Sequence, residues 1–372
     1  MMRGDLKRGW CPSLLRPMES GDGWLVRVRP RAAVITTAVA RSVSEAATRY
    51  GNGRIEITNR ANLQIRGLRL ETIPLFAAAM EAVGAADERE GSPTVLVSPL
   101  AGADPGVAAE TLSIAQSVVR AFNADGAMIQ SPKFGIVIDG GGVMPLTGVA
   151  LDVTLRAEGR RWLLNNMEVP PAEAPLRVLS LARTLTRAPR RTSPAPALGF
   201  YPYGPDRHGA VLLAPAFGQM LATQLASLAG LAERWGDGAL RPTPWKSLAV
   251  AGVAARDEGF LRDEANQIDI ISNPADPRLG IVTCAGAPAC LRGSVETLDA
   301  AMALAAARRA GDPLIHVSGC AKGCAHPGPA AVTLVGERGR FAFIRDGRPG
   351  DEPMARGLTL AQCAALVHSV PA

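Results

Sequence analysis

The sequence predicts an α+β protein built by tandem duplication of one unit, and three observations support that prediction. Residues 25–68 align without a gap on residues 210–253 when the chain is shifted by 185 positions. Each copy has the pattern of a strand, a helix and two more strands, which is half of a ferredoxin-like sandwich. Paired cysteines follow the second copy only. The two halves are therefore expected to share a fold and to differ in chemistry.

The alignment of the two copies is most regular at the turns. Pro30 aligns with Pro215, the stretch YGNG aligns with WGDG, and Gly67 aligns with Gly252. Chance similarity between two alanine-rich segments is the alternative explanation. It would not place glycines at the same turns of both copies, so we favour duplication.

The first copy predicts a regular series of elements. The helix at 36–50 rests on apolar residues at helical spacing and ends at the Gly-Asn-Gly turn. The strands rest on alternating β-branched residues. The expected strands are 25–30, 54–59 and 63–68, followed by a strand at 94–98, a helix at 107–123 and a strand at 135–139.

These elements predict five parts of the chain. Two ferredoxin-like half-domains are each followed by an α/β module, and only the second module carries paired cysteines. The stretch APRRTSPAPA reads as a Pro-rich linker between the copies. The expected boundaries are 1–75 for half-domain 1, 76–187 for module 1, 188–197 for the linker, 198–265 for half-domain 2 and 266–372 for the cluster-type module 2.

Composition indicates a soluble globular protein. Of the 372 residues, 47% are hydrophobic and 20% are charged, which allows a sizeable core. The basic N-terminus lacks the apolar segment of a secretory signal, so we expect a cytoplasmic protein. The charge-free run 209–232 contains Pro215 and Gly218 and reads as a strand, a turn and a buried helix rather than a membrane span.

The net charge of +6 favours an anionic partner. Nucleic acid is a poor candidate, because the basic residues are scattered and only five Trp, three Tyr and eight Phe are available for stacking on bases. An acidic small molecule fits better.

A polar face is expected in the first copy and not in the second. Period-two alternation puts every even-numbered residue from 54 to 66 on one face, and all of them are polar. The aligned face of the second copy has lost most of its charge, which points to anion binding in the first copy. A merely solvated face is the alternative. The first face is Arg54, Glu56, Thr58, Arg60, Asn62, Gln64 and Arg66, and the second is Ala239, Arg241, Thr243, Trp245, Ser247, Ala249 and Ala251.

The cysteines show the opposite asymmetry. They occur as C-x5-C and C-x3-C, in loops rich in Gly, Ala and Pro, and the first pair aligns with Ser98 and Asp104. The absence of a signal argues against a disulfide scaffold. This spacing is wide for a zinc knuckle and suits an iron–sulfur cluster, while zinc and unliganded thiols remain the alternatives.

The stretch TNRANLQIRG, together with these cysteines, resembles the sulfite/nitrite reductase superfamily and its T-x-R-x-x-x-Q-x-R-G pattern. The resemblance runs from about residue 8 to about residue 347. It implies a 4Fe–4S cluster beside a site for tetrapyrrole carboxylates. The implied cluster ligands are Cys284, Cys290, Cys320 and Cys324, and the implied binding residues are Arg27, Arg29, Thr58, Arg60, Gln64, Arg66 and, in SPKFGIVID, Lys133.

Two departures from the reductases bear on function. Gly135 follows the Lys-Phe pair where a second Lys is usual, and SPLAGADPG has no basic residue. A strong clamp for sulfite or nitrite is therefore missing. The stretches RGWCPSLLRPMES, SPLAGADP and SGCAKGCAHPGPA resemble the precorrin-3B synthase branch of the superfamily instead.

That branch implies an O2-dependent monooxygenase. Its members hydroxylate precorrin-3A at C20 and close a γ-lactone from a ring A acetate, with NADH as the nominal electron source. The chain shows no dinucleotide-binding fingerprint, so an external donor is expected. A siroheme-dependent sulfite or nitrite reductase and a non-catalytic electron-transfer protein are the alternatives.

The branch also implies a mononuclear non-haem iron as a further cofactor. His326 follows Cys324 by two residues and is the candidate catalytic histidine, with Lys133 as a second catalytic candidate. A surface or capping role for His326 is the alternative. No ligand set for this iron follows from the sequence.

Overall fold

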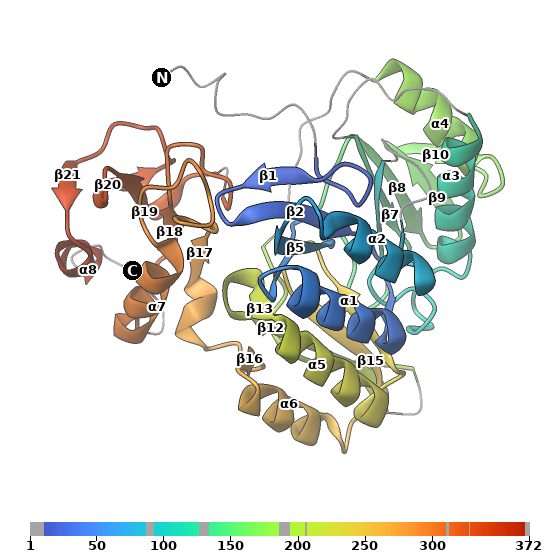
Figure 1. The fold of residues 1–372 in the computed structure, drawn as a ribbon. Coiled ribbons are helices and arrows are strands. Elements are labelled where there is room, and N and C mark those ends of the chain that lie inside the picture. Colours follow the sequence, from blue (N-terminus) through green and yellow to red (C-terminus); the bar gives the residue numbers. More distant parts are fainter. Residues whose placement is uncertain are drawn as a thin grey trace. The chain divides into compact units, whose positions relative to one another are not determined.

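The computed structural model describes residues 11–86, 93–125, 134–185, 194–204, 207–309, 312–326 and 328–368. The described chain divides into two compact units, each taken by itself below (Figure 1). The large unit comprises 11–18 and 25–272, and the small unit comprises 19–24 and 273–368.

Two half-domains of the same design make up much of the large unit, although residues 19–24 of the first belong to the small unit. In each, strands and a helix follow one another as the sequence predicts. The first contains β1 (Met18–Ser20), β2 (Gly23–Val28), β3 (Ile35–Thr36), α1 (Thr37–Tyr50), β4 (Arg54–Ile57), β5 (Leu63–Leu68) and α2 (Ile73–Ala82). The second contains β11 (Gly199–Tyr203), β12 (His208–Pro215), a short 3-10 turn (Ala216–Gly218), β13 (Gln219–Leu221), α5 (Ala222–Trp235), β14 (Ala239–Pro242), β15 (Leu248–Ala254), α6 (Glu258–Gln267) and β16 (Ile270–Ile271).

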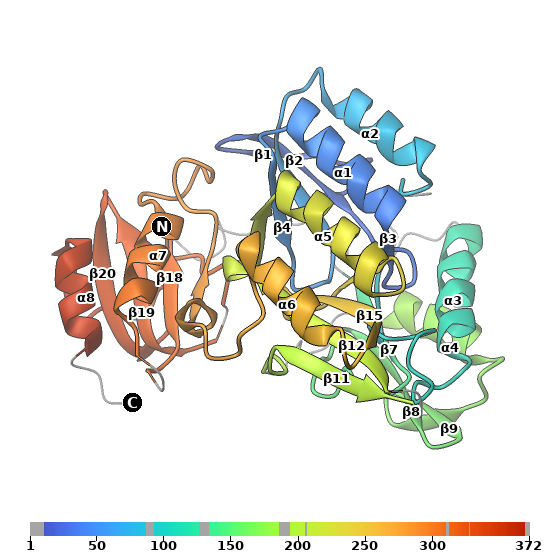
Figure 2. The same cartoon turned by 90° about the horizontal axis from the view of Figure 1, so that it is seen from below.

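The duplication predicted from the sequence is confirmed by the backbone. Helices α1 and α5 begin and end at positions 185 residues apart, and they pack side by side (Figures 1 and 2). Residues with positive φ also recur at this spacing: Ala61 at 54° and Lys246 at 61°, Gly67 at 73° and Gly252 at 75°. Both copies therefore fold through the same turns.

The two half-domains exchange short strands. Their sheets have the orders β1-β2-β5-β4-β13 and β11-β12-β15-β14-β3, with β16 paired to β12. Strand β13 of the second copy pairs with β4 of the first, where Gln219 lies opposite Glu56. Strand β3 of the first copy pairs with β14 of the second, where Ile35 lies opposite Leu240. The exchange joins both copies into one body, so neither sheet is complete without the other copy.

Module 1, also in the large unit, is an α/β layer. Strands β6, β7 and β8 are parallel, while β9 and β10 continue the sheet antiparallel. Helix α3 begins four residues later than the sequence predicts, because the amide of Ala108 donates to the carbonyl of Gly140 (2.9 Å) and holds this segment in a loop. The elements are β6 (Thr94–Val97), α3 (Thr111–Asp125), β7 (Gly135–Asp139), β8 (Val153–Glu158), β9 (Arg161–Leu164), β10 (Met167–Val169) and α4 (Ala174–Thr184).

Module 2 makes up most of the small unit and repeats the sheet of module 1. Its strand order is β17-β18-β19-β20-β21, again with three parallel strands followed by two antiparallel ones. Among the helices of the described chain, none is long and apolar enough to cross a membrane. The elements are a 3-10 turn (Pro277–Gly280), β17 (Ile281–Thr283), α7 (Thr297–Ala307), β18 (Ile315–Ser318), β19 (Ala330–Glu337), β20 (Arg340–Gly347), β21 (Ala355–Leu358) and α8 (Leu360–His368).

Candidate functional site

The polar face of the first copy is buried at its centre. Arg60 is 9% exposed, Gln64 is 7% exposed and Arg66 is 4% exposed. The solvated-face interpretation is therefore wrong for these residues. Charged side chains in such positions must be paired or hydrogen-bonded, because the loss of water is otherwise too costly. The side chains that pair with these three residues therefore determine which positions of the face remain for a ligand.

Glu56 organises one half of the face. Its carboxylate accepts a short hydrogen bond from the side-chain amide of Gln64. It also forms an ion pair with Nη1 of Arg66 at 3.2 Å. Arg27 Nε donates to Oε1 of Gln64 at 3.0 Å. Burial lowers the pKa of Arg27, while Cys11 and Glu56 act in the opposite direction. We call Arg27, Glu56, Gln64 and Arg66 the Glu56 network.

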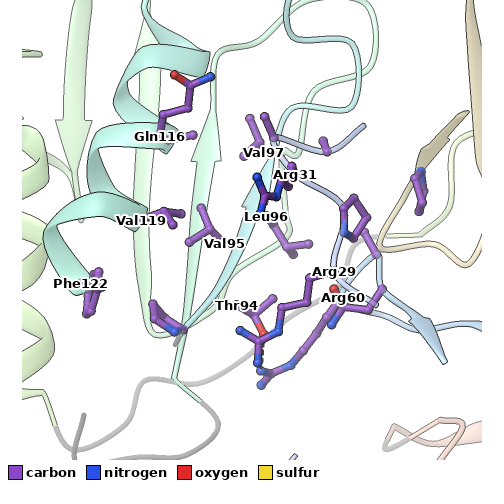
Figure 3. Close-up of a pocket in the computed structure, with 18 of the residues that line it drawn as sticks. Arg29, Arg31, Arg60, Thr94, Val95, Leu96, Val97, Gln116, Val119 and Phe122 are labelled. Atoms are coloured by element: carbon purple, nitrogen blue, oxygen red, sulfur yellow. Dashed lines mark hydrogen bonds between the residues drawn. The ribbon is translucent and has the colours of Figure 1, made fainter. Parts of the chain in front are cut away.

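The other half of the face opens into a cavity of about 460 Å³ within the large unit. Arg29, Arg31 and Arg60 line one wall, and Figure 3 shows Arg29 and Arg60 reaching in the same direction toward Thr94. Arg60 Nη1 donates to Thr94 Oγ1 at 3.1 Å. We call this space the arginine cavity.

The opposite wall of the arginine cavity is largely apolar. It is formed by β6 and α3, whose apolar side chains Val95, Leu96, Val119 and Phe122 line it (Figure 3), together with the polar Gln116, Arg120 and Asn123 of α3. Guanidinium groups bind carboxylates through paired, charge-assisted hydrogen bonds, and an apolar wall accommodates a hydrocarbon or ring. The cavity is therefore suited to a ligand that carries carboxylates on an apolar body.

Thr58 shapes the turn that carries Arg60. Its hydroxyl accepts hydrogen bonds from the amides of Arg60 (3.3 Å) and Asn62 (3.2 Å). In the second copy, Thr243 and Ser247 bond in the same turn, with their hydroxyl oxygens 2.6 Å apart. Its equivalent of Arg60 is Trp245, which packs against an apolar cluster of module 1. The asymmetry expected between the two faces is thus present in the structure.

Sequence reasoning missed three parts of this site. Arg31 lines the cavity although it lies beyond the predicted strand, and Thr94 reaches Arg60 from module 1. Glu56 was assigned to the face without its role as the partner of Arg66 and Gln64. A Pro-Arg pair directly after a basic strand was the available signal for Arg31. Lys133 lies outside the described residues.

The four candidate cluster cysteines lie on two loops of the small unit. Cys284 and Cys290 follow β17, and Cys320 and Cys324 follow β18. The amide of Gly319 donates to Cys284 Sγ at 3.3 Å. These side chains belong to two neighbouring parallel strands, whose carboxyl ends lie at one edge of the sheet.

Glycines allow close packing within and between the two cysteine loops. A Cβ added at Gly293 would lie 2.6 Å from the amide nitrogen of Ala287. A Cβ added at Gly319 would lie 3.1 Å from the Cα of Gly286. Both distances are shorter than a Cβ ordinarily allows, so a side chain at Gly293 would distort the first loop and one at Gly319 would push the two loops apart. The small-residue composition of these loops therefore has a steric cause.

The thiols influence one another. Burial raises the pKa of Cys284, and the nearby Cys290 and Cys320 add to that rise. Burial raises the pKa of Cys324 to about 11, with the other three thiols acting in the same direction and Lys322 opposing them. Four thiolates in this arrangement repel one another and would be stabilised by a bound cationic centre.

The donor set fits a 4Fe–4S cluster. It offers four thiolates and a backbone amide directed at sulfur, both typical of such sites. Within the described parts of the chain, no three His, Cys, Asp or Glu side chains converge on a position for one metal ion. In a cubane each thiolate binds a different iron, so the four sulfurs need not converge on one point.

A hairpin tip of the small unit supports the first cysteine loop. Ser20 Oγ donates to the carbonyl of Ala289 at 2.7 Å, and the amide of Gly21 donates to the same oxygen at 3.2 Å. A Cβ added at Gly21 would lie 2.1 Å from the carbonyl oxygen of Pro288. Ser20 and Gly21 thus hold the first cysteine loop although they lie far before module 2 in the sequence, and at position 21 only glycine fits.

His326 lies against a second histidine. Its ring meets His316 edge to face, with centroids 5.7 Å apart, and its Nε2 is 3.1 Å from the carbonyl of Pro329. These contacts fix the ring beside the Cys320–Cys324 loop. A catalytic role for His326 remains a prediction.

Comparisons with known proteins agree with the fold class. The family model described as the nitrite/sulfite reductase ferredoxin-like half domain matches residues 16–83. A precorrin-3B synthase from a Sinorhizobium species is 32% identical, over 98% of this chain and 89% of its own length. A ferredoxin–nitrite reductase from Synechococcus elongatus is 24% identical, over 89% and 79%. The structure of the Mycobacterium tuberculosis NirA protein superposes with a TM-score of 0.70 at 19% identity, over 92% of this chain and 79% of its own, a likeness of fold.

Proposed function

This chain belongs to the precorrin-3B synthase family, and on that premise we propose that it hydroxylates precorrin-3A at C20 in aerobic cobalamin biosynthesis. One atom of O2 enters the product, and the other leaves as water with two protons and two electrons. A γ-lactone closes from the ring A acetate. NADH supplies the electrons through an external donor, because the sequence has no dinucleotide-binding fingerprint.

The observation that carries the proposal is the arginine cavity. Precorrin-3A is a tetrapyrrole with carboxylate side chains, and this cavity has Arg29, Arg31 and Arg60 on one wall and a largely apolar wall opposite. We propose that Arg29, Arg31 and Arg60 bind carboxylates at one edge of the substrate. Thr58 positions Arg60 through its turn, and the apolar wall on β6 and α3 packs against the macrocycle.

The cysteine quartet would hold the cofactor of this reaction. Cys284, Cys290, Cys320 and Cys324 fit a 4Fe–4S cluster, which when bound supplies single-electron transfer. A cytoplasmic location is part of the proposal, because a reducing compartment keeps these thiols available. The ratio of iron to sulfide in anaerobically purified protein tests the additional non-haem iron, because a cubane alone contains equal amounts of both.

The test of the activity uses the purified holoprotein with precorrin-3A, an electron source and isotopically labelled dioxygen. We expect one labelled oxygen in the product by mass spectrometry, and protein that purifies without stoichiometric siroheme. Bound siroheme together with sulfite or nitrite turnover, and no product from precorrin-3A, would establish the reductase alternative. Tetrapyrrole that fails to bind at all would favour a plain electron-transfer protein.

The binding site can be tested by a pair of variants at aligned positions. Arg60→Ala should weaken binding of precorrin-3A by about one to two decades, because a hydrogen bond to a charged group contributes roughly 1.5–3 kcal/mol. Trp245→Ala changes the aligned residue of the second copy and should remove no carboxylate contact. Unchanged affinity of the Arg60→Ala protein would rule out the arginine cavity as the carboxylate site.

A further inference from the structure

Glu56 is the acidic residue of a polar face whose other charged residues are arginines, and it engages two residues that sequence reasoning assigns to ligand binding. Its carboxylate takes an amide proton of Gln64 and pairs with Arg66 at 3.2 Å. The side chain of Arg66 is 5% exposed and that of Glu56 is 17% exposed. An ion pair this sheltered from water is screened little, so each partner largely neutralises the other.

The register of the sheet makes this pairing specific. Glu56 lies directly opposite Gln64 on β5 and, on its other side, opposite Gln219 on β13. The aligned residue of the second copy is Arg241, which pairs with Asp237 four residues earlier. The charge at this position is therefore opposite in the two copies. In each copy a nearby residue of opposite sign compensates it.

We propose that Glu56 is a specificity-determining residue that fills, with its own carboxylate, the subsite formed by Gln64 and Arg66. This inference rests on the proposed function. Incoming carboxylates are then held by the arginine cavity through Arg29, Arg31 and Arg60, and not by Arg66. Glu56 thereby limits how many carboxylates of a tetrapyrrole the face can bind, and it selects against ligands that depend on the second subsite.

The test varies the number of carboxylates on the ligand. Fluorescence titration of the holoprotein would use uroporphyrin, coproporphyrin and mesoporphyrin, which carry eight, four and two carboxylates. In Glu56→Gln, Arg66 is released for a ligand carboxylate, so affinity for uroporphyrin should rise roughly tenfold or more. Affinity for mesoporphyrin should change little, because its two carboxylates are accommodated by the arginine cavity.

Two controls make the result specific. Glu173→Gln removes the same charge from an exposed pair with Arg177 on α4, and it should reproduce none of the gain. The double variant Glu56→Gln/Arg66→Gln should bind all three porphyrins as the native protein does, since the neutralised pair contributes nothing to binding. That double variant also tests the proposal if Glu56→Gln alone folds poorly, because it does not leave Arg66 buried without its carboxylate partner.

The outcomes separate this inference from the proposed function. A double variant that binds tenfold more weakly than native protein would show that Arg66 binds the ligand, and the inference would be overturned. An equal gain for all three porphyrins in Glu56→Gln would overturn it as well. If Arg60→Ala still weakens binding in either case, the carboxylate site of the proposed function stands. Unchanged binding in Arg60→Ala would instead refute the site itself.

Discussion

Module 1 and module 2 keep equivalent hydrogen bonds of the backbone, but the side chains at the aligned positions differ. The amide of Gly140 donates to Ser98 Oγ in module 1 (2.8 Å), and the amide of Gly319 donates to Cys284 Sγ in module 2 (3.3 Å). The carbonyl of Gly140 accepts from Ala108, and that of Gly319 accepts from Ser294 in the same way.

The side chains decide what holds each loop together. In module 1, Asp104 accepts from the amides of Gly106 (2.7 Å) and Val143 (2.8 Å). Ser98 donates to Asp139 at 3.1 Å, and Asp139 pairs with Arg156 at 3.2 Å. These loops satisfy their own polar groups. The aligned positions in module 2 are thiols whose mutual repulsion calls for a bound centre.

This difference teaches that the duplicated sheet supplies a frame and the loops supply the chemistry. Loops at the carboxyl ends of parallel strands vary without disturbing the sheet, because the ladder hydrogen bonds involve only the backbone. One module can therefore carry four thiols in its loops while its copy is stabilised by carboxylates. Four experiments test this contrast.

The largest effect is expected for the loss of one cluster thiol. Cys320→Ala should lose most bound iron and sulfide, because a cubane with three thiolates is poorly retained. Metal analysis and the thiolate-to-iron absorbance of anaerobically purified protein measure this. Cys363→Ala removes a thiol of α8 away from both loops and should keep the full cluster. Normal iron content in the Cys320→Ala protein would contradict the assignment of the quartet.

The second-largest effect is expected for removal of the Asp104 carboxylate, which accepts hydrogen bonds from two loop amides of module 1. Asp104→Ala leaves the amides of Gly106 and Val143 without their acceptor. The free energy of unfolding should fall by about 2–4 kcal/mol, since hydrogen bonds to a charged group contribute roughly 1.5–3 kcal/mol each. Urea denaturation measures it.

The control for Asp104 lies in the same module. Glu168→Ala breaks an exposed pair with Arg161 at 3.7 Å and should cost less than about 0.5 kcal/mol. Equal stability of the Asp104→Ala and native proteins would mean that the loops of module 1 do not depend on this carboxylate. Cluster content should be unchanged in both variants.

A smaller effect is expected at the hairpin tip that supports the cysteine loop. In Gly21→Ala the new Cβ would lie 2.1 Å from the carbonyl oxygen of Pro288, so the loop must shift. Release of iron to a chelator should become several-fold faster, followed as the decay of cluster absorbance. Gly230→Ala on α5 meets no atom within 4 Å and serves as the control. Equal rates of iron release from the two variants would show that the hairpin contact does not contribute to cluster retention.

The smallest effect concerns the chemical reactivity of Cys363. Burial raises the pKa of this thiol to about 11, and the residue is 0% exposed. Because the thiolate is the reactive form, alkylation in the folded protein should be slow at pH 8 and should accelerate as the pH rises toward 11. Mass spectrometry after timed alkylation measures the rate. Rapid labelling at pH 8 would show that α8 opens readily.

Much of the fold was predictable because its signals are local. Helical spacing and the Gly-Asn-Gly turn located α1 to within one residue, and gapless alignment carried the same element to α5. The repeated glycines identify the shared turns, since positive φ is accessible mainly to glycine. The start of α3 was missed because a contact with Gly140, far along the chain, holds the preceding residues in a loop.

The candidate site also has features that the sequence predicts and features that only the folded chain reveals. The sequence alone determined which residue types lie on the polar face and which cysteines form pairs, because alternation and spacing are properties of the chain itself. Only the tertiary structure decided that the Glu56 carboxylate bonds to Gln64 and Arg66, and that Thr94 accepts a hydrogen bond from Arg60. Those partners depend on strand register and on the packing of module 1 against the first copy. Buried charges choose their partners by proximity in space, and no local pattern in the sequence encodes that proximity.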